Sequence, residues 1–112
     1  MSYSVIAIRP FDRQIKQLIK KYPSLKAELA KLILSLEDNP TQGTLLHSSC
    51  YKIRLSISSK GKGKSGGARV ITYLQVVNET VFLLSIYDKS DQENISENTI
   101  KALLKTYIDK YI

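Results

Sequence analysis

The chain has little cysteine, little histidine and no long apolar run, and each shortage excludes a class of protein. Cys50 is its one cysteine and His47 its one histidine, so an internal disulfide and a zinc site built from these residue types are excluded. Apolar runs end after a few residues, as at 81–84, and the first residues lack the basic start and apolar stretch of a secretory signal. We therefore expect a soluble, cytoplasmic protein with no metal, no cofactor and no membrane contact.

Positive charge, in contrast, is abundant. The 112 residues carry 17 basic and 10 acidic side chains, which gives a net charge of +7. A chain of this length has room for one domain, which we expect to span 1–112. An excess of this kind indicates a polyanionic partner or an acidic protein that neutralises it. Between residues 50 and 89 only Glu79 and Asp88 are acidic, whereas the basic residues there are Lys52, Arg54, Lys60, Lys62, Lys64, Arg69 and Lys89. We therefore expect the binding face in this central segment.

Hydrophobic spacing predicts the helices and the first strand. Residues 3–8 are rich in β-branched side chains and precede Pro10, which predicts a strand. Apolar residues at helical spacing predict helices over 11–21 and 25–36, which Pro23 separates and of which Ser24 caps the second. The same spacing, with Ser96 as the cap, predicts a final helix from 97 to 111.

After residue 50 the hydrophobic period changes from that of a helix to that of a strand. Alternation over 51–57 predicts a strand with Lys52 and Arg54 on one face, and 68–77 and 80–87 predict two more strands joined tightly at 78–79. The element order β-α-α-β-β-β-α predicts an α+β fold, an antiparallel-rich sheet on which the helical hairpin and the C-terminal helix pack. We expect the helices on one face and the other face partly open.

The open face is predicted to gather four cations, Lys52, Arg54, Arg69 and Lys89, from neighbouring strands. Strands in a sheet lie about 5 Å apart, so side chains of this length can reach one phosphodiester together. The pattern alone leaves a second interpretation open. A sheet covered on one side carries polar residues outward in any case, and strand lysines also protect a sheet edge from aggregation.

The glycine- and lysine-rich segment 60–67 is predicted to be a loop that contacts an RNA backbone through Lys60, Lys62 and Lys64. The alternative is a mobile hairpin loop whose lysines only aid solubility. The Gly-Lys-Ser at 63–65 is not a nucleotide-binding P-loop, because Ser58 stands where that motif needs its first glycine and a strand follows in place of a helix.

The remaining reactive side chains are weaker candidates. His47 has no acidic residue spaced to orient it, and Cys50 is expected to be a small, partly buried residue. Tyr51, Tyr73 and Tyr87 have the rings that stack on bases, but tyrosine also packs well in strands. Of the three we retain Tyr87 as a candidate site residue.

Three segments together carry a resemblance to a known family: Cys-Tyr-Lys-Ile-Arg-Leu at 50–55, Gly-Ala-Arg-Val-Ile-Thr-Tyr at 67–73 and Leu-Ser-Ile-Tyr-Asp-Lys at 84–89. With the preceding helical hairpin and the final helix, the chain resembles the RelE/ParE superfamily of type II toxins, and within it the RelE- and HigB-like mRNA interferases. The resemblance implies a toxin held inactive by a cognate antitoxin, which enters the ribosome and cleaves mRNA as a metal-independent endoribonuclease.

The resemblance also implies roles for individual residues. Arg54 and Arg69 would stabilise the phosphate, and Lys89 would serve the leaving group or the phosphate. Many relatives place a catalytic tyrosine about six residues after the last basic strand residue, where this chain has Ile95. The proton acceptor therefore stays open between Lys52 and Tyr87.

Two other functions also stay open. The ParE branch of the superfamily shares the fold but inhibits gyrase, and a catalytically degenerate member would only bind nucleic acid or its antitoxin.

Overall fold

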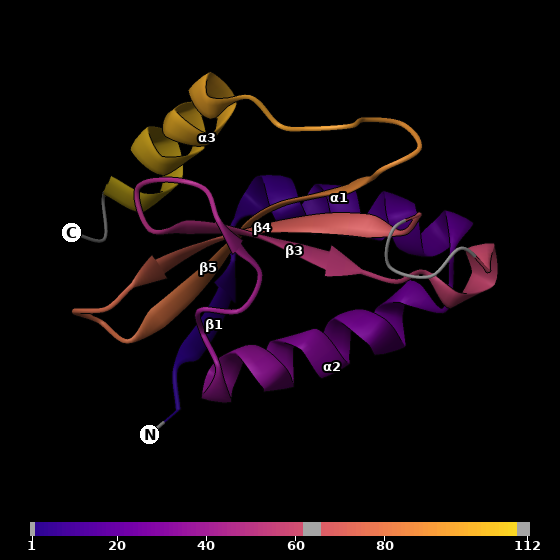
Figure 1. The fold of residues 1–112 in the computed structure, drawn as a ribbon, viewed down its shortest axis with the longest axis horizontal. Coiled ribbons are helices and arrows are strands. Elements are labelled where there is room, and N and C mark those ends of the chain that lie inside the picture. The colour runs from indigo at the N-terminus through magenta and orange to yellow at the C-terminus, as the bar shows by residue number, and fades with distance from the viewer. Residues whose placement is uncertain (1, 62–65, 110–112) are drawn as a thin grey trace.

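The computed structural model describes residues 2–61 and 66–109, which form an α+β fold with three α-helices and one five-stranded sheet (Figure 1). The elements are β1 (Ser4–Ala7), α1 (Arg9–Lys21), α2 (Leu25–Asp38), β2 (Thr44–Leu45), β3 (Cys50–Leu55), the 3-10 turn η1 (Ser58–Lys60), β4 (Ala68–Gln75), β5 (Thr80–Asp88), α3 (Glu97–Leu103) and a π-helical turn, η2 (Leu104–Ile108). The predicted fold class is confirmed. Among the helices of residues 2–61 and 66–109, we find no segment with the length and hydrophobicity of a membrane span.

The sheet has the strand order β1-β5-β4-β3-β2. The predicted meander is present as β3, β4 and β5, which pair antiparallel, and β1 lies parallel to β5 at one edge. The two-residue strand β2 was not predicted, because so short a segment carries no periodicity; it pairs with Tyr51 and Lys52 of β3. The outer edge of β3 beyond Lys52 therefore has no strand partner in β2.

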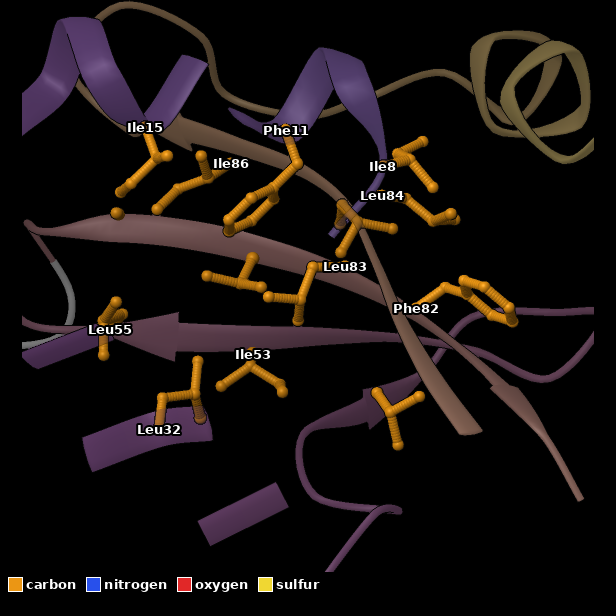
Figure 2. Packing of buried hydrophobic residues seen from close by; sticks show 14 of the residues in the cluster. Ile8, Phe11, Ile15, Leu32, Ile53, Leu55, Phe82, Leu83, Leu84 and Ile86 are labelled. Carbon is orange, nitrogen blue, oxygen red and sulfur yellow. The ribbon is translucent and has the colours of Figure 1, made fainter. Parts of the chain in front are cut away.

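Helix α1 attaches the helical hairpin to the interior strand β5. It begins at Arg9 and takes Pro10 into its first turn, where a missing N–H costs no hydrogen bond. Phe11 and Ile15 are buried in the core (Figure 2). The pairing of β1 with β5 ends at Leu83, and the side-chain oxygen of Gln14 accepts the N–H of Ile86 at 3.0 Å. This side chain satisfies a backbone group that β1 is too short to reach.

The prediction that one face of the sheet stays open is wrong for β5. Ile86 and Tyr87 are adjacent and therefore point to opposite faces, yet they are only 1% and 6% exposed. The helical hairpin covers the face of Ile86. On the other face the chain turns back across the sheet after β5 and leads to α3 (Figure 1). The open area is thereby restricted to the part of this face nearer β3.

The two predicted helix caps differ in outcome. The hydroxyl of Ser96 accepts the N–H of Thr99 at 3.1 Å, which confirms the cap of α3. The predicted cap at Ser24 is wrong in its contact, because Ser24 has helical backbone angles and its hydroxyl bonds to that of Ser59 at 2.6 Å. A capping serine needs extended angles to turn its oxygen toward the helix N–H groups. Ser24 joins α2 to η1 instead.

Candidate functional site

The register of the sheet brings the predicted arginines together. Arg54 on β3 lies directly opposite Arg69 on β4, and Arg69 lies opposite Tyr87 on β5. Directly paired residues share one face of a sheet, as do residues two apart in a strand, so Lys52 is on this face too. Like charges placed opposite each other destabilise a strand pair. The fold thus tolerates an unfavourable arrangement at the place where the sequence predicted a phosphate site.

A cavity of about 310 Å³ lies on this face, and all four predicted cations line it. Its lining residues are Thr44, Lys52, Arg54, Arg69, Lys89, Glu93 and Asn94. A larger groove of about 940 Å³ shares Thr44, Lys52 and Arg54 and continues along α2. The four cations meet in one concave site, and the groove provides a path that leads to it.

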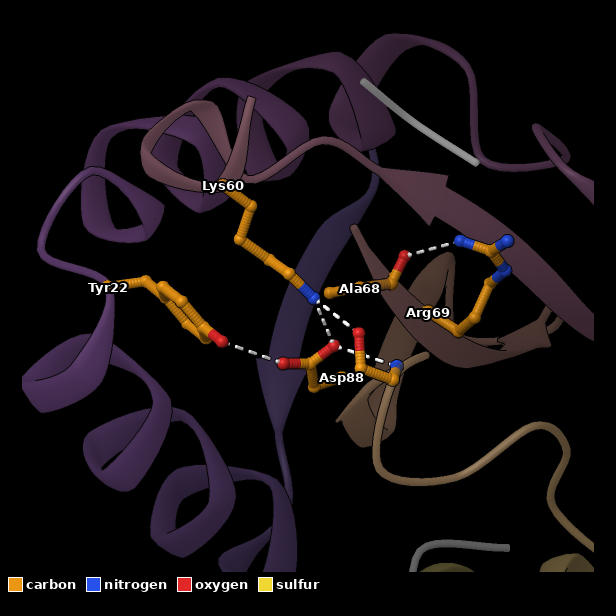
Figure 3. A network of polar contacts seen from close by, with 6 residues as sticks. Tyr22, Lys60, Ala68, Arg69 and Asp88 are labelled. Atoms are coloured by element: carbon orange, nitrogen blue, oxygen red, sulfur yellow. Dashed lines mark hydrogen bonds and ion pairs between the residues drawn. The ribbon is translucent and has the colours of Figure 1, made fainter. Parts of the chain in front are cut away.

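The cations differ in how firmly they are held. Arg69 is 3% exposed, and one guanidinium nitrogen donates to the carbonyl of Ala68 at 3.1 Å (Figure 3). Arg54 and Lys89 are exposed, and Lys52 is half-buried. The backbone N–H of Lys89 donates to the carbonyl of Gly67 at 3.0 Å, which fixes where this side chain starts. The site therefore has a rigid arginine at its base and three cations that can adjust to a ligand.

Gly67 allows the two strands that carry the arginines to approach closely. A Cβ at this position would collide with the carbonyl oxygen of Leu55 and lie 3.0 Å from the N–H nitrogen of Ile57. The sequence interpretation placed Gly67 in a flexible loop, whereas in the structure it is buried immediately before β4. It is part of the framework of the site.

Tyr87 lies beside the cavity but does not line it. The side chain is 6% exposed, and its hydroxyl oxygen is buried with no hydrogen-bond partner among the described residues. Burial raises the pKa of Tyr87, an effect that Arg69 opposes. The hydroxyl is therefore protonated at neutral pH, which makes it a weak proton acceptor.

Lys60 is not brought to the cavity. Its ammonium forms an ion pair with Asp88 at 2.7 Å, donates to the hydroxyl of Ser90 at 2.7 Å and lies 5.6 Å from the ring centre of Tyr22 (Figure 3). Asp88 follows Tyr87 in β5 and so points to the opposite face from the cavity. The other two lysines predicted to contact RNA, Lys62 and Lys64, lie outside the described residues.

Asp88 is the centre of this second polar cluster. Burial would raise its pKa, but hydrogen bonds from Lys60, from the Ser90 N–H and from the Tyr22 hydroxyl outweigh burial and lower the pKa below its usual value. The cluster joins the C-cap of α1, η1 and the end of β5 (Figure 3). It thus fixes the strand end from which Lys89 projects.

The weaker candidates stay apart from the cavity. Cys50 is fully buried, and burial raises the pKa of its thiol to about 11, so the reactive thiolate is scarce at neutral pH. Tyr73 stacks on Phe82 with ring centres 6.3 Å apart, the packing role expected of a strand tyrosine. The Nδ1 atom of His47 is buried without a partner in the described part of the chain. Within that part, no three His, Cys, Asp or Glu side chains are grouped so as to hold a metal ion.

Thr44, Glu93 and Asn94 were missed from the sequence. Thr44 belongs to the short strand β2, and the other two lie in the segment between β5 and α3, which has neither helical nor strand periodicity. One signal was available. Glu93 follows Lys89 by four residues, so a chain that turns back across the sheet could return it to the same face.

A protein-family model, described as the RelE toxin of the RelE/RelB toxin–antitoxin system, matches residues 9–111 of this chain. The chain belongs to the RelE toxin family. Two solved structures of the Escherichia coli RelE toxin have the same fold. A double-arginine mutant of that toxin in its free state is 21% identical, with a TM-score of 0.59, over 83% of this chain and 90% of the other. The isolated E. coli toxin is 20% identical, with a TM-score of 0.57, over 93% of this chain and 98% of the other.

Membership of the RelE family has two direct consequences. The protein is a toxin of the toxin–antitoxin type, and an antitoxin of the RelB type is its expected partner. The resemblance to RelE-type toxins predicted from the three sequence segments is confirmed.

Proposed function

We propose that this RelE-family toxin is a metal-independent endoribonuclease that cleaves mRNA on the ribosome and thereby stops translation. The observation that carries the proposal is the convergence of Lys52, Arg54, Arg69 and Lys89 on one cavity of about 310 Å³. Cations of this number in a concave site suit a phosphodiester, whose negative charge grows as the reaction proceeds. A sheet surface that only kept the protein soluble would not need them to converge.

The reaction that fits these residues uses the RNA itself as nucleophile. The ribose 2′-oxygen attacks the adjacent phosphorus, and the bond from phosphorus to the 5′-oxygen of the next nucleotide breaks. Arg54 and Arg69 would hold the non-bridging oxygens, since guanidinium groups bind phosphate through paired hydrogen bonds. Lys89, at the exposed end of β5, would give a proton to the departing 5′-oxygen. No activated water is required, so the chemistry needs no metal ion.

The ribosome would supply the ordered substrate. The cavity is small, and the chain has a net charge of +7, which favours RNA-rich surfaces over isolated short RNA. Lys62 and Lys64 would add contacts to the RNA backbone. The protein would therefore act in the cytoplasm, where ribosomes translate.

The antitoxin would block the same surface. An acidic segment laid over the cavity and along the groove beside α2 would neutralise the cations that the substrate needs. The groove follows the β3 edge, which β2 leaves without a strand partner beyond Lys52, so an extended segment is a suitable shape.

The test is the chemistry of the products. Ribosomes stalled on a defined mRNA are incubated with the purified toxin, and the ends of the cleaved mRNA are analysed with and without EDTA. The proposal expects a 2′,3′-cyclic phosphate, a 5′-hydroxyl and no effect of EDTA. Intact mRNA, together with inhibition of gyrase supercoiling by the same preparation, would instead assign the protein to the gyrase-inhibiting type.

A further inference from the structure

The cavity contains many proton donors and almost no group that can accept a proton. Lysine and arginine side chains only donate hydrogen bonds, and Lys52, Arg54, Arg69 and Lys89 make up most of the lining. The 2′-hydroxyl cannot attack phosphorus efficiently unless its proton is removed. Tyr87 is unsuited to this step, because its hydroxyl is buried and its pKa is raised. The proposed reaction therefore lacks a clear base among the residues predicted from the sequence.

Glu93 is the acidic side chain that lines the cavity. We propose that its carboxylate accepts the proton of the ribose 2′-hydroxyl, an inference that rests on the proposed RNA cleavage. A carboxylate only accepts hydrogen bonds when ionised. Glu93 is exposed and forms no ion pair or hydrogen bond within the described part of the chain. It can therefore turn toward a bound substrate.

Neighbouring acidic residues are occupied or lie outside the cavity. Asp88 is bound by Lys60 on the other face of the sheet, and Glu97 pairs with Lys101 on α3 at 3.4 Å. Asp91 is exposed and does not line the cavity. Glu93 thus differs from the other acids of this region by position.

The backbone around Glu93 is held in place although the segment has no regular secondary structure. The N–H groups of Asp91 and Gln92 donate to the carbonyl of Asp88 at 3.0 and 3.1 Å, and the Gln92 side-chain amide donates to the carbonyl of Asn94 at 3.0 Å. Ile95 is partly buried and packs against the core. The segment is anchored on both sides of Glu93, and Ile95 serves as one of the anchors.

The step balances without any further reactant. Glu93 takes the 2′-proton as the 2′-oxygen forms its bond to phosphorus, and the bond between phosphorus and the 5′-oxygen breaks as Lys89 protonates that oxygen. The products are a 2′,3′-cyclic phosphate and a 5′-hydroxyl. The ammonium of Lys89 and the carboxylate of Glu93 then recover their charges by exchanging one proton with solvent.

The experiment compares Glu93→Gln with Asp91→Asn. The second variant also removes one negative charge, but at a residue two positions earlier that does not line the cavity. Single-turnover cleavage of mRNA on programmed ribosomes is measured at pH 7, with Glu93→Asp as a further variant. We expect Glu93→Gln to cleave about 10²- to 10⁴-fold more slowly. Asp91→Asn should match the wild type, and Glu93→Asp should retain part of the rate.

The possible outcomes separate the two proposals. Loss of a negative charge should leave RNA binding unchanged or tighter, so slower cleavage by Glu93→Gln at undiminished ribosome binding supports proton transfer. Cleavage by Glu93→Gln at the rate of Asp91→Asn overturns the role of Glu93 and leaves the ribonuclease function standing. A wild-type protein that leaves mRNA intact overturns both. Far-UV circular dichroism verifies that each variant is folded.

Discussion

The ion pair between Lys60 and Asp88 makes a strong prediction about stability. The two charged atoms are 2.7 Å apart, and the side chains are only 8% and 1% exposed. Lys60→Met keeps most of the apolar stem beside Tyr22 but leaves the Asp88 carboxylate buried without its counter-charge. Removing one partner of a buried pair typically costs about 3–5 kcal/mol. We expect a loss of this size at pH 7, a large part of the stability of a chain this small.

A double variant separates the charge effect from packing. In Lys60→Met/Asp88→Asn neither buried charge remains, and the asparagine oxygen can still accept from Tyr22 or from the Ser90 N–H. We expect it to recover most of the stability that Lys60→Met loses, because no uncompensated charge is left in the core. Lys26→Met, which changes an exposed lysine of α2, should stay within about 0.5 kcal/mol of the wild type.

The same pair predicts a pH dependence with a definite sign. The pKa of Asp88 is lowered in the folded protein, since the hydrogen bonds from Lys60, Ser90 and Tyr22 outweigh burial. Its contribution to stability is therefore complete above the unfolded-state pKa of roughly 3.9 and disappears as the pH falls through the lower folded-state pKa. Without Lys60, burial is opposed less and the folded-state pKa rises. The stability difference between the wild type and Lys60→Met should therefore shrink as the pH falls below roughly 3.9, because protonation of Asp88 removes a contribution that only the wild type has in full.

Urea unfolding followed by far-UV circular dichroism measures both effects, because the chain has no tryptophan whose fluorescence could be used. Free energies of unfolding for the wild type and the three variants are compared at pH 7 and at successively lower pH. If the free energy of unfolding of Lys60→Met lies within about 1 kcal/mol of the wild-type value and the variant cleaves mRNA more slowly, the structural role of Lys60 is refuted. That result would restore the RNA contact predicted from the sequence.

Two further predictions concern the framework and the partner of the site. Gly67→Ala should lose about 1–3 kcal/mol in urea unfolding and cleave more slowly, because the added methyl collides with the β3 backbone. A loss below about 0.5 kcal/mol, the size usual for an exposed position, would contradict this close approach. Arg54→Ala/Arg69→Ala should bind the antitoxin more weakly than the wild type in calorimetric titrations, and its affinity should fall less steeply with salt concentration. An affinity that falls with salt as steeply as that of the wild type would place the antitoxin away from the cations.

The meander and its cations could be predicted because the information is local. Alternation along β3 places Lys52 and Arg54 on one face, and short connections make β3, β4 and β5 neighbours, so Arg69 has to lie near Arg54. The helices are equally local, since apolar residues recur at helical spacing between prolines. The four cations of the cavity were all identified in this way.

The missed features depend on contacts between residues that are far apart in the sequence. Lys60 was expected to bind RNA, but its partner Asp88 lies 28 residues later and on a different element. Glu93 enters the cavity only because the chain turns back across the sheet after β5, and a segment without periodicity carries no sign of that path. Ser24 has the sequence signal of a cap, yet its contact with Ser59 depends on how η1 packs beside α2.

Primer extension on mRNA in a purified translation system, with and without ribosomes, tests most directly whether this toxin cleaves mRNA on the ribosome. It compares the wild type with Arg54→Ala/Arg69→Ala and with Lys20→Ala/Lys26→Ala, which removes two exposed cations of the helical hairpin. We expect ribosome-dependent cuts by the wild type and by the hairpin variant, and none by the arginine variant. Cuts that persist when both cavity arginines are removed, or intact mRNA with the wild-type protein on ribosomes, would contradict this expectation.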